Sequence, residues 1–459
     1  PEVKHNNPRM WDKEDYIMVV QHNMQAMNAN RMLNVTTSAQ SKSTEKLSSG
    51  YKINRAADDA AGLTISEKMR KQIRGLDQAS TNAQDGVSSV QTAEGALTEV
   101  HSMLQRMNEL ATQAANGTNS KDSDRQAIQD EIDQLTTEID RVSETTKFNE
   151  TYLLKGEAGT KTINMKAHDA GLKGTLTDNG DGTATFVMDS LKDGDSVSIG
   201  GKTYKIGSKL DDAKNLIKAP ATGTVDVEIG DQKFKIKSDG EVQNANGDKL
   251  YVKTADGSAA AATFTAGTST FTTSATFMNN AQTPTATANN ALSVQNLQAL
   301  VKGGVTVKVG NDTAIAMTDT AGGAADGVDD NDATLITRQK AYELAGKELL
   351  AANSIGDTEN HVAVTNGNGD ALAFDKGDGS FKINVGQAKV ANSLAFSLHV
   401  GADADMTNKI QVNIDAMDSA SLGIKGLNIK DDSGNAATYA VDAISDAISK
   451  VSSQRSSLG

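Results

Sequence analysis

The histidines are the first side chains to consider for catalysis or metal binding, and each of them stands alone. They lie at positions 5, 22, 101, 168, 361 and 399. A zinc metallopeptidase needs two histidines one helical turn apart with a glutamate between them, and no pair here has that spacing. Cysteine is absent, which removes disulfides and thiolate metal sites. The sequence therefore predicts no enzyme, no catalytic residue, no cofactor and no metal.

Two glycine-rich stretches resemble phosphate and calcium loops, and each departs from the required pattern. Gly200-Gly201-Lys202-Thr203 ends like a phosphate loop, but Ser196 stands in place of the first glycine and a strand is predicted to follow. Asp178–Gly182 resembles a calcium loop, although Gly180 occupies the third ligand position and residue 189 is Asp rather than Glu. We predict no nucleotide site in the first stretch and a plain hairpin turn in the second.

Two long helices are the elements that must position any functional side chain. Apolar or small residues recur at alternating steps of three and four at Leu76, Ala79, Ala83, Gly86, Val90, Ala93, Leu97, Val100, Leu104, Met107, Ala111 and Ala114. After a loop, a second series follows at Ile128, Ile132, Leu135, Ile139 and Val142. A 3.5-residue repeat keeps one stripe facing a partner helix, and two long helices with a short connection fold back antiparallel. The pattern predicts packing and does not indicate a purpose.

The composition changes between residues 156 and 392, where Gly, Thr, Asp, Ala and Asn dominate. Alternating runs separated by turn pairs predict strands at 183–187, 196–199, 225–229, 234–236, 305–309 and 381–385. Two amphipathic helices are predicted at 211–217 and 332–352, the second with Asp332 as its cap. Residues 258–287 are the best linker candidate, and Asp329–Asp332 is predicted as a solvated acidic loop that would hold a cation only weakly.

Length, charge and aromatic content narrow the class of protein. The chain has 459 residues, only 4% of them aromatic, which cannot build one large aromatic-rich core. A formal charge of −14 disfavours nucleic acid as a partner. The sequence contains no run of 18 apolar residues, and it therefore predicts no membrane-spanning helix. We therefore predict an α+β protein, in which an elongated antiparallel helical coiled-coil rod carries one or more inserted β-rich outer domains.

The first residues share no pattern with the rest. Residues 1–17 hold the only Trp and are expected to be a non-native extension, with the natural start at Met18. Residues 19–56 favour a helix but offer little apolar surface, at positions such as Met24, Met27 and Leu33. Such a helix is expected to become ordered only against other helices.

The motifs of the amino-terminal third resemble those of bacterial flagellins. The resemblance is collinear over about residues 18–155 and rests on 18–24, Leu47-Ser48-Ser49-Gly50, Asp58-Asp59-Ala60-Ala61-Gly62, 91–97 and Asp140-Arg141-Val142. It returns near the other end, at 398–402, 408–410, 421–424 and 451–455. The sequence is thus similar to a flagellin whose final carboxy-terminal helices are missing after Gly459.

The resemblance implies a domain arrangement, which we state as an expectation. It assigns 18–56 to the amino-terminal helix of the inner filament domain, 57–155 to the amino-terminal part of a helical rod, and 156–392 to variable outer domains. The truncated carboxy-terminal part of the rod would be 393–459. Because the final helices are absent, the innermost coiled coil is expected to be incomplete.

The resemblance also implies a function and partners. Flagellins leave the bacterium through the flagellar export apparatus, without a cleavable signal peptide. They polymerise with themselves outside the cell into the filament used for swimming, and they contact cap and hook-associated proteins. Open helical polymers of this kind arise from heterologous contacts that do not close. Neither nucleic acid nor membrane is an expected partner.

A receptor site is carried over from flagellins recognised by host Toll-like receptor 5. The matching positions are Arg106, Leu110 and Glu131. Arg106 and Leu110 are four residues apart and lie off the seam, so an exposed Arg and Leu beside a Glu of the neighbouring helix are expected. An ordinary solvent-facing patch that also serves filament packing is the competing interpretation.

Two alternatives remain at this level. A hook-filament junction protein shares the amino-terminal pattern, although the match at 47–50 and 58–62 favours flagellin. The other alternative is a secreted adhesive or immune-modulating protein that binds through its β-rich region. A pelletable filament of uniform diameter would separate the first class from the last.

Overall fold

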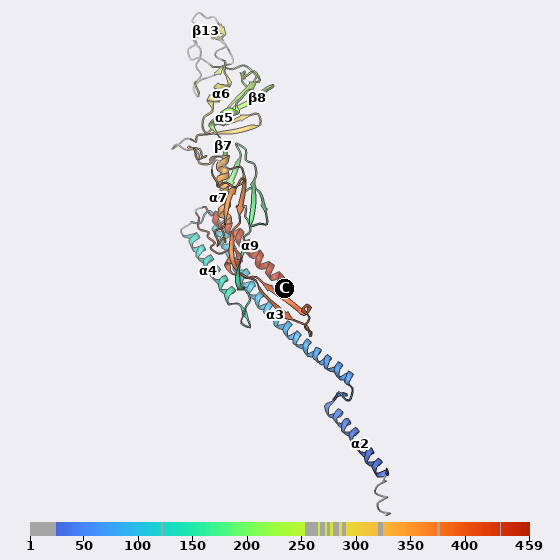
Figure 1. Ribbon diagram of the computed structural model, residues 1–459. Helices are drawn as coiled ribbons and strands as arrows, with labels where there is room; N and C mark the ends of the chain where they lie inside the picture. Colours follow the sequence, from blue (N-terminus) through green and yellow to red (C-terminus); the bar gives the residue numbers. More distant parts are fainter. Residues whose placement is uncertain are drawn as a thin grey trace, which may run out of the picture. The chain divides into compact units, whose positions relative to one another are not determined.

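The computed structural model describes residues 24–120, 123–252, 265–266, 271–272, 276–278, 284–286, 291–319, 325–373, 377–431 and 433–459 (Figure 1). They form two compact units. Unit 1 holds the described residues up to Val87 together with Ser397–Gln411, and unit 2 holds those of Ser88–Phe396 and Val412–Gly459. The predictions for residues 1–17, for Met18 and for most of 258–287 lie outside the described residues.

Local sequence signals set the ends of the amino-terminal helices. Helix α2 (Met24–Ser49) stops at Gly50, whose φ of +72° is readily adopted only by glycine. Helix α3 (Ala60–Ala114) begins after Asp59, whose Oδ1 accepts a hydrogen bond from the Gly62 amide at 2.9 Å. Helix α4 is Asp124–Thr145. The other helices are α5 (Leu210–Leu216), α6 (Val294–Leu300), α7 (Arg338–Asn353), the 3₁₀ turn η2 (Met406–Asn408), α8 (Ser419–Leu422) and α9 (Asn435–Leu458).

Two larger sheets lie in unit 2. The eight-stranded sheet has the order β10-β9-β8-β15-β16-β7-β17, with β6 also paired to β7. Its strands are β6 (Ser196–Ile199), β7 (Lys202–Lys209), β8 (Thr224–Ile229), β9 (Gln232–Lys237), β10 (Val242–Gln243), β15 (Thr306–Val309), β16 (Asp312–Met317) and β17 (Leu335–Thr337). The four-stranded sheet has the order β18-β19-β5-β4. Its strands are β4 (Gly174–Asp178), β5 (Thr183–Met188), β18 (Ala363–Asn366) and β19 (Ser380–Asn384). All six strand predictions are confirmed.

The remaining described strands form two-stranded pairs. They are β1 (Lys147–Phe148) with β2 (Thr151–Tyr152), β3 (Glu157–Asn164) with β20 (Gln387–Asn392), β11 (Tyr251–Val252) with β12 (Phe271–Thr272), β13 (Thr276–Met278) with β14 (Pro284–Ala286), and β21 (Leu394–His399) with β22 (Lys409–Ile414). The combination of long helices and strand-rich regions is an α+β fold.

Unit 2 has a separate hydrophobic core for each group of elements. One core joins the later part of α3 to α4 and α9. A second lies between the four-stranded sheet and α7, where the rings of Phe186 and Phe381 stack with centroids 6.2 Å apart. A third joins the eight-stranded sheet to α5 and α6. Several small cores explain how a chain with so few aromatic residues can fold.

The predicted cap of the 332–352 helix is wrong. Helix α7 begins at Arg338, and the Thr337 hydroxyl accepts a hydrogen bond from the Lys340 amide at 3.2 Å. Asp332 instead accepts hydrogen bonds from the amide and hydroxyl of Thr334 and stabilises a turn. The intervening residues form β17, which pairs with β7, so strand pairing takes residues that periodicity alone assigned to the helix.

Candidate functional site

Arg106 and Glu131, two of the three predicted receptor-site residues, form an exposed ion pair on unit 2. Arg106 Nε lies 2.9 Å from Glu131 Oε1, and Arg106 Nη1 lies 3.2 Å from Glu109 Oε2. The side chains of Arg106 and Glu131 are 50% and 43% exposed. The hydrogen bonds that Arg106 donates to Glu131 and then to Glu109 raise the pKa of its guanidinium, which is charged at any physiological pH. The sequence analysis missed Glu109, although its i, i+3 spacing from Arg106 is a usable signal.

The antiparallel packing of α3 and α4 brings this pair together. Arg106 of α3 meets Glu131 of α4, while nearer the loop Arg125 Nε donates to the Ala114 carbonyl oxygen at 2.9 Å. Arg125 also donates to the carbonyl oxygens of Asp431, at 2.7 Å, and Asn116, at 3.5 Å. Its guanidinium therefore ties the end of α3 to the start of α4 and to the loop before α9.

Leu110 requires a correction, because it is not exposed. Its side chain is 2% exposed and belongs to the core shared by α3, α4 and α9. The expectation of exposure assumed one partner helix and a narrow stripe. The core contains residues of α4 and α9 as well as α3, and the buried face of α3 is wider than a two-helix stripe and includes Leu110 next to Met107 and Ala111. An isolated Leu110 side chain therefore cannot be a solvent-facing anchor in the folded chain.

Most of the predicted packing residues are buried in that same core. Leu97, Val100, Leu104 and Met107 of α3 and Ile132 and Ile139 of α4 are each 0% exposed, and Ile128 is 7% exposed. Leu135 and Val142 are partly buried against the core, and Val90 is partly buried. Helix α9 contributes Ala440, Ile444, Ala447 and Val451.

Unit 1 has a different surface. Ile65, Met69, Ile73 and Leu76 lie at helical spacing on α3 and are 55–58% exposed. The β21–β22 hairpin covers a neighbouring part of the helix, where a Cβ on Gly86 would meet Leu398 Cδ1 at 2.1 Å and Asn82 Nδ2 donates to the His399 carbonyl at 2.9 Å. The small residue Gly86 thus allows the β21–β22 hairpin to pack closely on α3, while the four large apolar side chains remain exposed to solvent.

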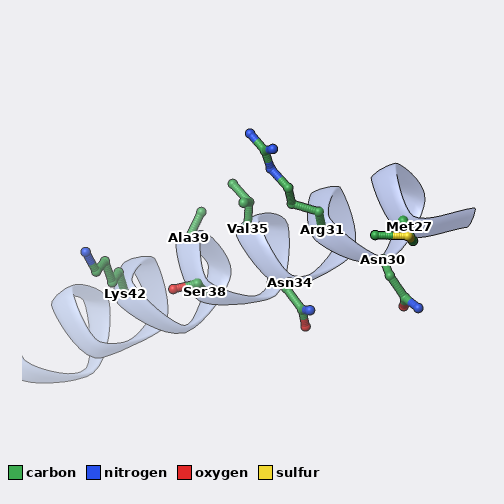
Figure 2. Close-up of a pocket in the computed structure, with 8 residues that line it drawn as sticks. All are labelled: Met27, Asn30, Arg31, Asn34, Val35, Ser38, Ala39 and Lys42. Atoms are coloured by element: carbon green, nitrogen blue, oxygen red, sulfur yellow. The ribbon is translucent and has the colours of Figure 1, made fainter. Parts of the chain in front are cut away.

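Helix α2 has no buried residue in the described chain. Figure 2 shows Arg31, Val35, Ala39 and Lys42 in one row along the helix, with Asn30 and Asn34 projecting on the other side. Met24, Met27 and Leu33 are also exposed. Apolar and basic side chains are therefore both exposed on the surface of α2.

The loop motifs singled out in the sequence are structural. Gly200 and Gly201, with φ of +56° and +71°, form the turn between β6 and β7, and Asp178–Gly182 forms the turn between β4 and β5, as predicted. Asp329 is buried, and its carboxylate accepts amide hydrogen bonds from Thr318, Asn331 and Asp332. No group of three or more histidines and carboxylates within the described ranges is arranged to hold a metal ion. In the same ranges, no helix is long and apolar enough to cross a membrane.

Comparison with known families gives one match, to the amino-terminal part of the chain. Residues 20–159 match the model of the bacterial flagellin N-terminal helical region. This range contains α2, α3 and α4, and therefore both Arg106 and Glu131.

Curated relatives match about a third of the chain. A flagellin of Clostridium tyrobutyricum is 62% identical over 139 residues, which is 30% of this chain and 37% of that protein. A flagellin of Halalkalibacterium halodurans is 55% identical over 155 residues (34% and 57%), and one of Bacillus subtilis is 59% identical over 140 residues (30% and 46%). The chain spans between 37% and 57% of the length of these relatives. The solved structure of FliC from Burkholderia pseudomallei aligns with 82% of this chain and 97% of its own, at 20% identity and a TM-score of 0.26, which is too low to support any argument.

Proposed function

Residues 20–159 of this chain carry the bacterial flagellin N-terminal helical region, and from that premise we propose that the chain is a structural subunit of the flagellar filament rather than an enzyme. The observation that carries the proposal is the match of residues 20–159 to the flagellin N-terminal helical region, together with identities of 55–62% to three flagellins over 139–155 residues. Filaments of this kind are extracellular, so the working location is outside the cell.

The surface of unit 1 supports self-assembly. Ile65, Met69, Ile73 and Leu76 form an apolar stripe on α3, which we call the unit 1 stripe. Contiguous exposed apolar side chains are unusual on monomeric proteins and mark contact surfaces. In a polymer, this stripe and helix α2 would be covered by matching surfaces of the same protein.

The domain expectations extend the proposal. Residues 18–56 would form the inner part of the filament, 57–155 and 393–459 a coiled-coil rod, and 156–392 the outward-facing part. The export apparatus, the cap and the hook-associated proteins would be the partners that deliver and cap the subunit.

Assembly can be tested by sedimentation and electron microscopy of the purified chain, seeded with short filament fragments. We expect filaments of uniform diameter, and loss of pelleting in Ile73→Asp together with Leu76→Asp. Lys71→Asp, on the opposite face of the same helix, is the matched control and should still assemble. A monomer that never joins seeded filaments but binds glycans or host surfaces would support a secreted adhesin instead.

We further propose that the Arg106–Glu131 pair forms a surface recognised by Toll-like receptor 5. The pair is exposed, charged and held by two packed helices, which suits a hot spot at a protein interface. Leu110 would act by supporting the helix face from beneath, because its side chain is buried.

Receptor-dependent reporter cells separate recognition from stability. Arg106→Ala and Glu131→Ala should each weaken signalling at least tenfold while leaving the unfolding midpoint nearly unchanged. Arg141→Ala, which breaks the similarly exposed pair with Glu138, is the control and should signal normally. Equal signalling by all three variants would contradict the proposal.

A further inference from the structure

A charged cluster joins the segment after β3 to helix α9 in unit 2. Lys166 Nζ lies 3.0 Å from Asp446 Oδ1, and His168 Nε2 lies 3.4 Å from Asp446 Oδ2. The side chains of His168 and Asp446 are 19% and 28% exposed. Asp446 Oδ2 is buried and has no hydrogen-bond partner, so His168 is the group placed to satisfy it.

Asn353 of α7 fixes the position of His168. Its side-chain Oδ1 accepts a hydrogen bond from the His168 amide, and its Nδ2 donates to the His168 carbonyl, both at 2.9 Å. Asn353 is itself buried, and Nδ2 also donates to the Leu349 carbonyl at 2.7 Å. The backbone of His168 therefore cannot move away from α7 without breaking two hydrogen bonds.

The charges around the imidazole are mostly negative. Asp442 lies one turn before Asp446 on α9, and Asp169 follows His168 on its own segment; both act electrostatically on this site. Lys166 is the positive charge of the segment, and Lys450 of α9 lines the same cavity of about 280 Å³ with its Nζ donating to the Ser421 carbonyl. Helix α7 contributes the uncharged Asn353, and α8 contributes Ser421.

We propose that His168 is a pH-sensitive clasp that holds Met165–Ala170 against α9 when its imidazole is protonated. The protonated ring pairs with Asp446 and offsets Asp442 and Asp169. Loss of the proton leaves three carboxylates against two lysines, one of them already hydrogen-bonded to a carbonyl. The segment leads from β3 to β4, so the clasp controls how firmly the start of the strand-rich region is fastened to the helical core.

The shift in the pKa of Asp442 predicts a pH dependence in the same direction as protonation of His168. Partial desolvation raises the pKa of the Asp442 carboxyl, the positive charge of His168 opposes this shift, and the charges of Asp169 and Asp446 add to it. A raised carboxyl pKa stabilises the folded state at low pH and does so less as pH rises. Deprotonation of either group therefore weakens the contact, because it removes a positive charge at His168 or adds a negative charge at Asp442.

Amide hydrogen exchange of the whole chain tests the clasp, with rates corrected for the intrinsic effect of pH. Protection of peptides covering 165–170 should fall about twofold to fivefold between pH 5.5 and pH 8.0, the range expected for one partly exposed ion pair. In His168→Gln and in Asp446→Asn, this pH dependence should disappear. Asp442→Asn should raise protection at pH 8.0 because it removes a neighbouring negative charge.

The matched control is His361→Gln, because His361 Nδ1 is hydrogen-bonded to the Val385 carbonyl oxygen at 2.9 Å and not to a carboxylate. The wild-type pH dependence at 165–170 should persist in that variant. Protection that does not change with pH in the wild type, or that changes equally in His168→Gln, would overturn the proposal. The result does not depend on filament formation, so it stands or falls separately from the proposed function.

Discussion

The two ends of helix α3 carry the same kind of apolar repeat, but one end is buried against other helices and the other is exposed to solvent. In unit 2, Leu97, Val100, Leu104 and Met107 are fully buried by α4 and α9. In unit 1, Ile65, Met69, Ile73 and Leu76 are more than half exposed. One helix therefore contains both a folded core and an unused apolar surface.

The difference shows that periodicity predicts a stripe and leaves the partner undefined. Burying a leucine or methionine side chain contributes roughly 1.5–3 kcal/mol, so an apolar stripe will be covered wherever the chain supplies a second surface. For the later half of α3, the chain supplies two helices. For the earlier half, it supplies a hairpin that covers Gly86 and leaves the larger side chains in solvent.

The largest effect is expected from truncating the buried half. Leu104→Ala should lower the free energy of unfolding of unit 2 by about 2–5 kcal/mol, because it opens a cavity among fully buried side chains. Leu76→Ala should change it by less than about 0.5 kcal/mol, because Leu76 is exposed and alanine favours a helix. Urea unfolding of the unassembled chain, followed by circular dichroism, measures both. Similar losses in the two variants would remove the contrast between the halves.

A somewhat smaller effect is expected at Arg125, which joins α3, α4 and the loop before α9. Arg125→Met keeps the length of the side chain but removes the donor to the carbonyl oxygens of Ala114 and Asp431, while the Asn116 carbonyl still accepts from the Asn119 amide. Leaving the buried Ala114 carbonyl without this donor costs about 1–3 kcal/mol, and a loss of that size is expected. Arg125→Lys should recover only part of it, because one ammonium cannot reach three acceptors in a fork. Full stability in Arg125→Met would mean that water replaces the guanidinium.

The helices and strands could largely be predicted from local chemistry. Turn pairs separated the six predicted strands, and each of these runs overlaps a strand of the structure. The predicted cap of α7, Asp332, was wrong because the residues after it form β17. This strand pairs with β7, whose residues lie about 130 positions earlier in the chain. Such long-range pairing leaves little trace in local periodicity.

The candidate site was only partly predictable for the same reason. The sequence could place Arg106 and Glu131 on neighbouring helices, but it could not show that the core containing residues of α3, α4 and α9 also contains Leu110. Arg125 was also missed, although a basic residue in the first turn of a helix is unfavourable to the helix dipole and thus indicates a specific role. In both cases the missing information was the arrangement of elements distant in sequence.

The next smaller effect concerns the exposed pair itself. A double-mutant cycle of Arg106→Ala and Glu131→Ala should give a coupling energy of about 0.2–1 kcal/mol, because solvent screens an exposed ion pair. Raising the salt concentration should reduce it further. Chemical unfolding of the four proteins provides the measurement. A coupling above about 2 kcal/mol would show that the pair belongs to the folded core rather than to an accessible surface.

The smallest effect is expected at the connection between α2 and α3 in unit 1, where polar contacts replace a core. Hydrogen bonds from the Asn54 amide, then the Arg55 amide, and the charge of Lys46 lower the pKa of the Asp58 carboxyl. A lowered carboxyl pKa means that the stabilisation is complete above the ordinary value and is lost as pH falls through the folded-state value. Exchange of the Asn54 and Arg55 amides, corrected for intrinsic rates, should therefore lose protection below about pH 4. Asp58→Asn should remove this pH dependence, while Asp77→Asn should preserve it. If the pH dependence survives in Asp58→Asn, the Asp58 carboxylate does not hold the connection between α2 and α3, and apolar contacts must do so. The difference between unit 2, which has an apolar core, and unit 1, whose described residues form none, would then apply only to the two halves of helix α3.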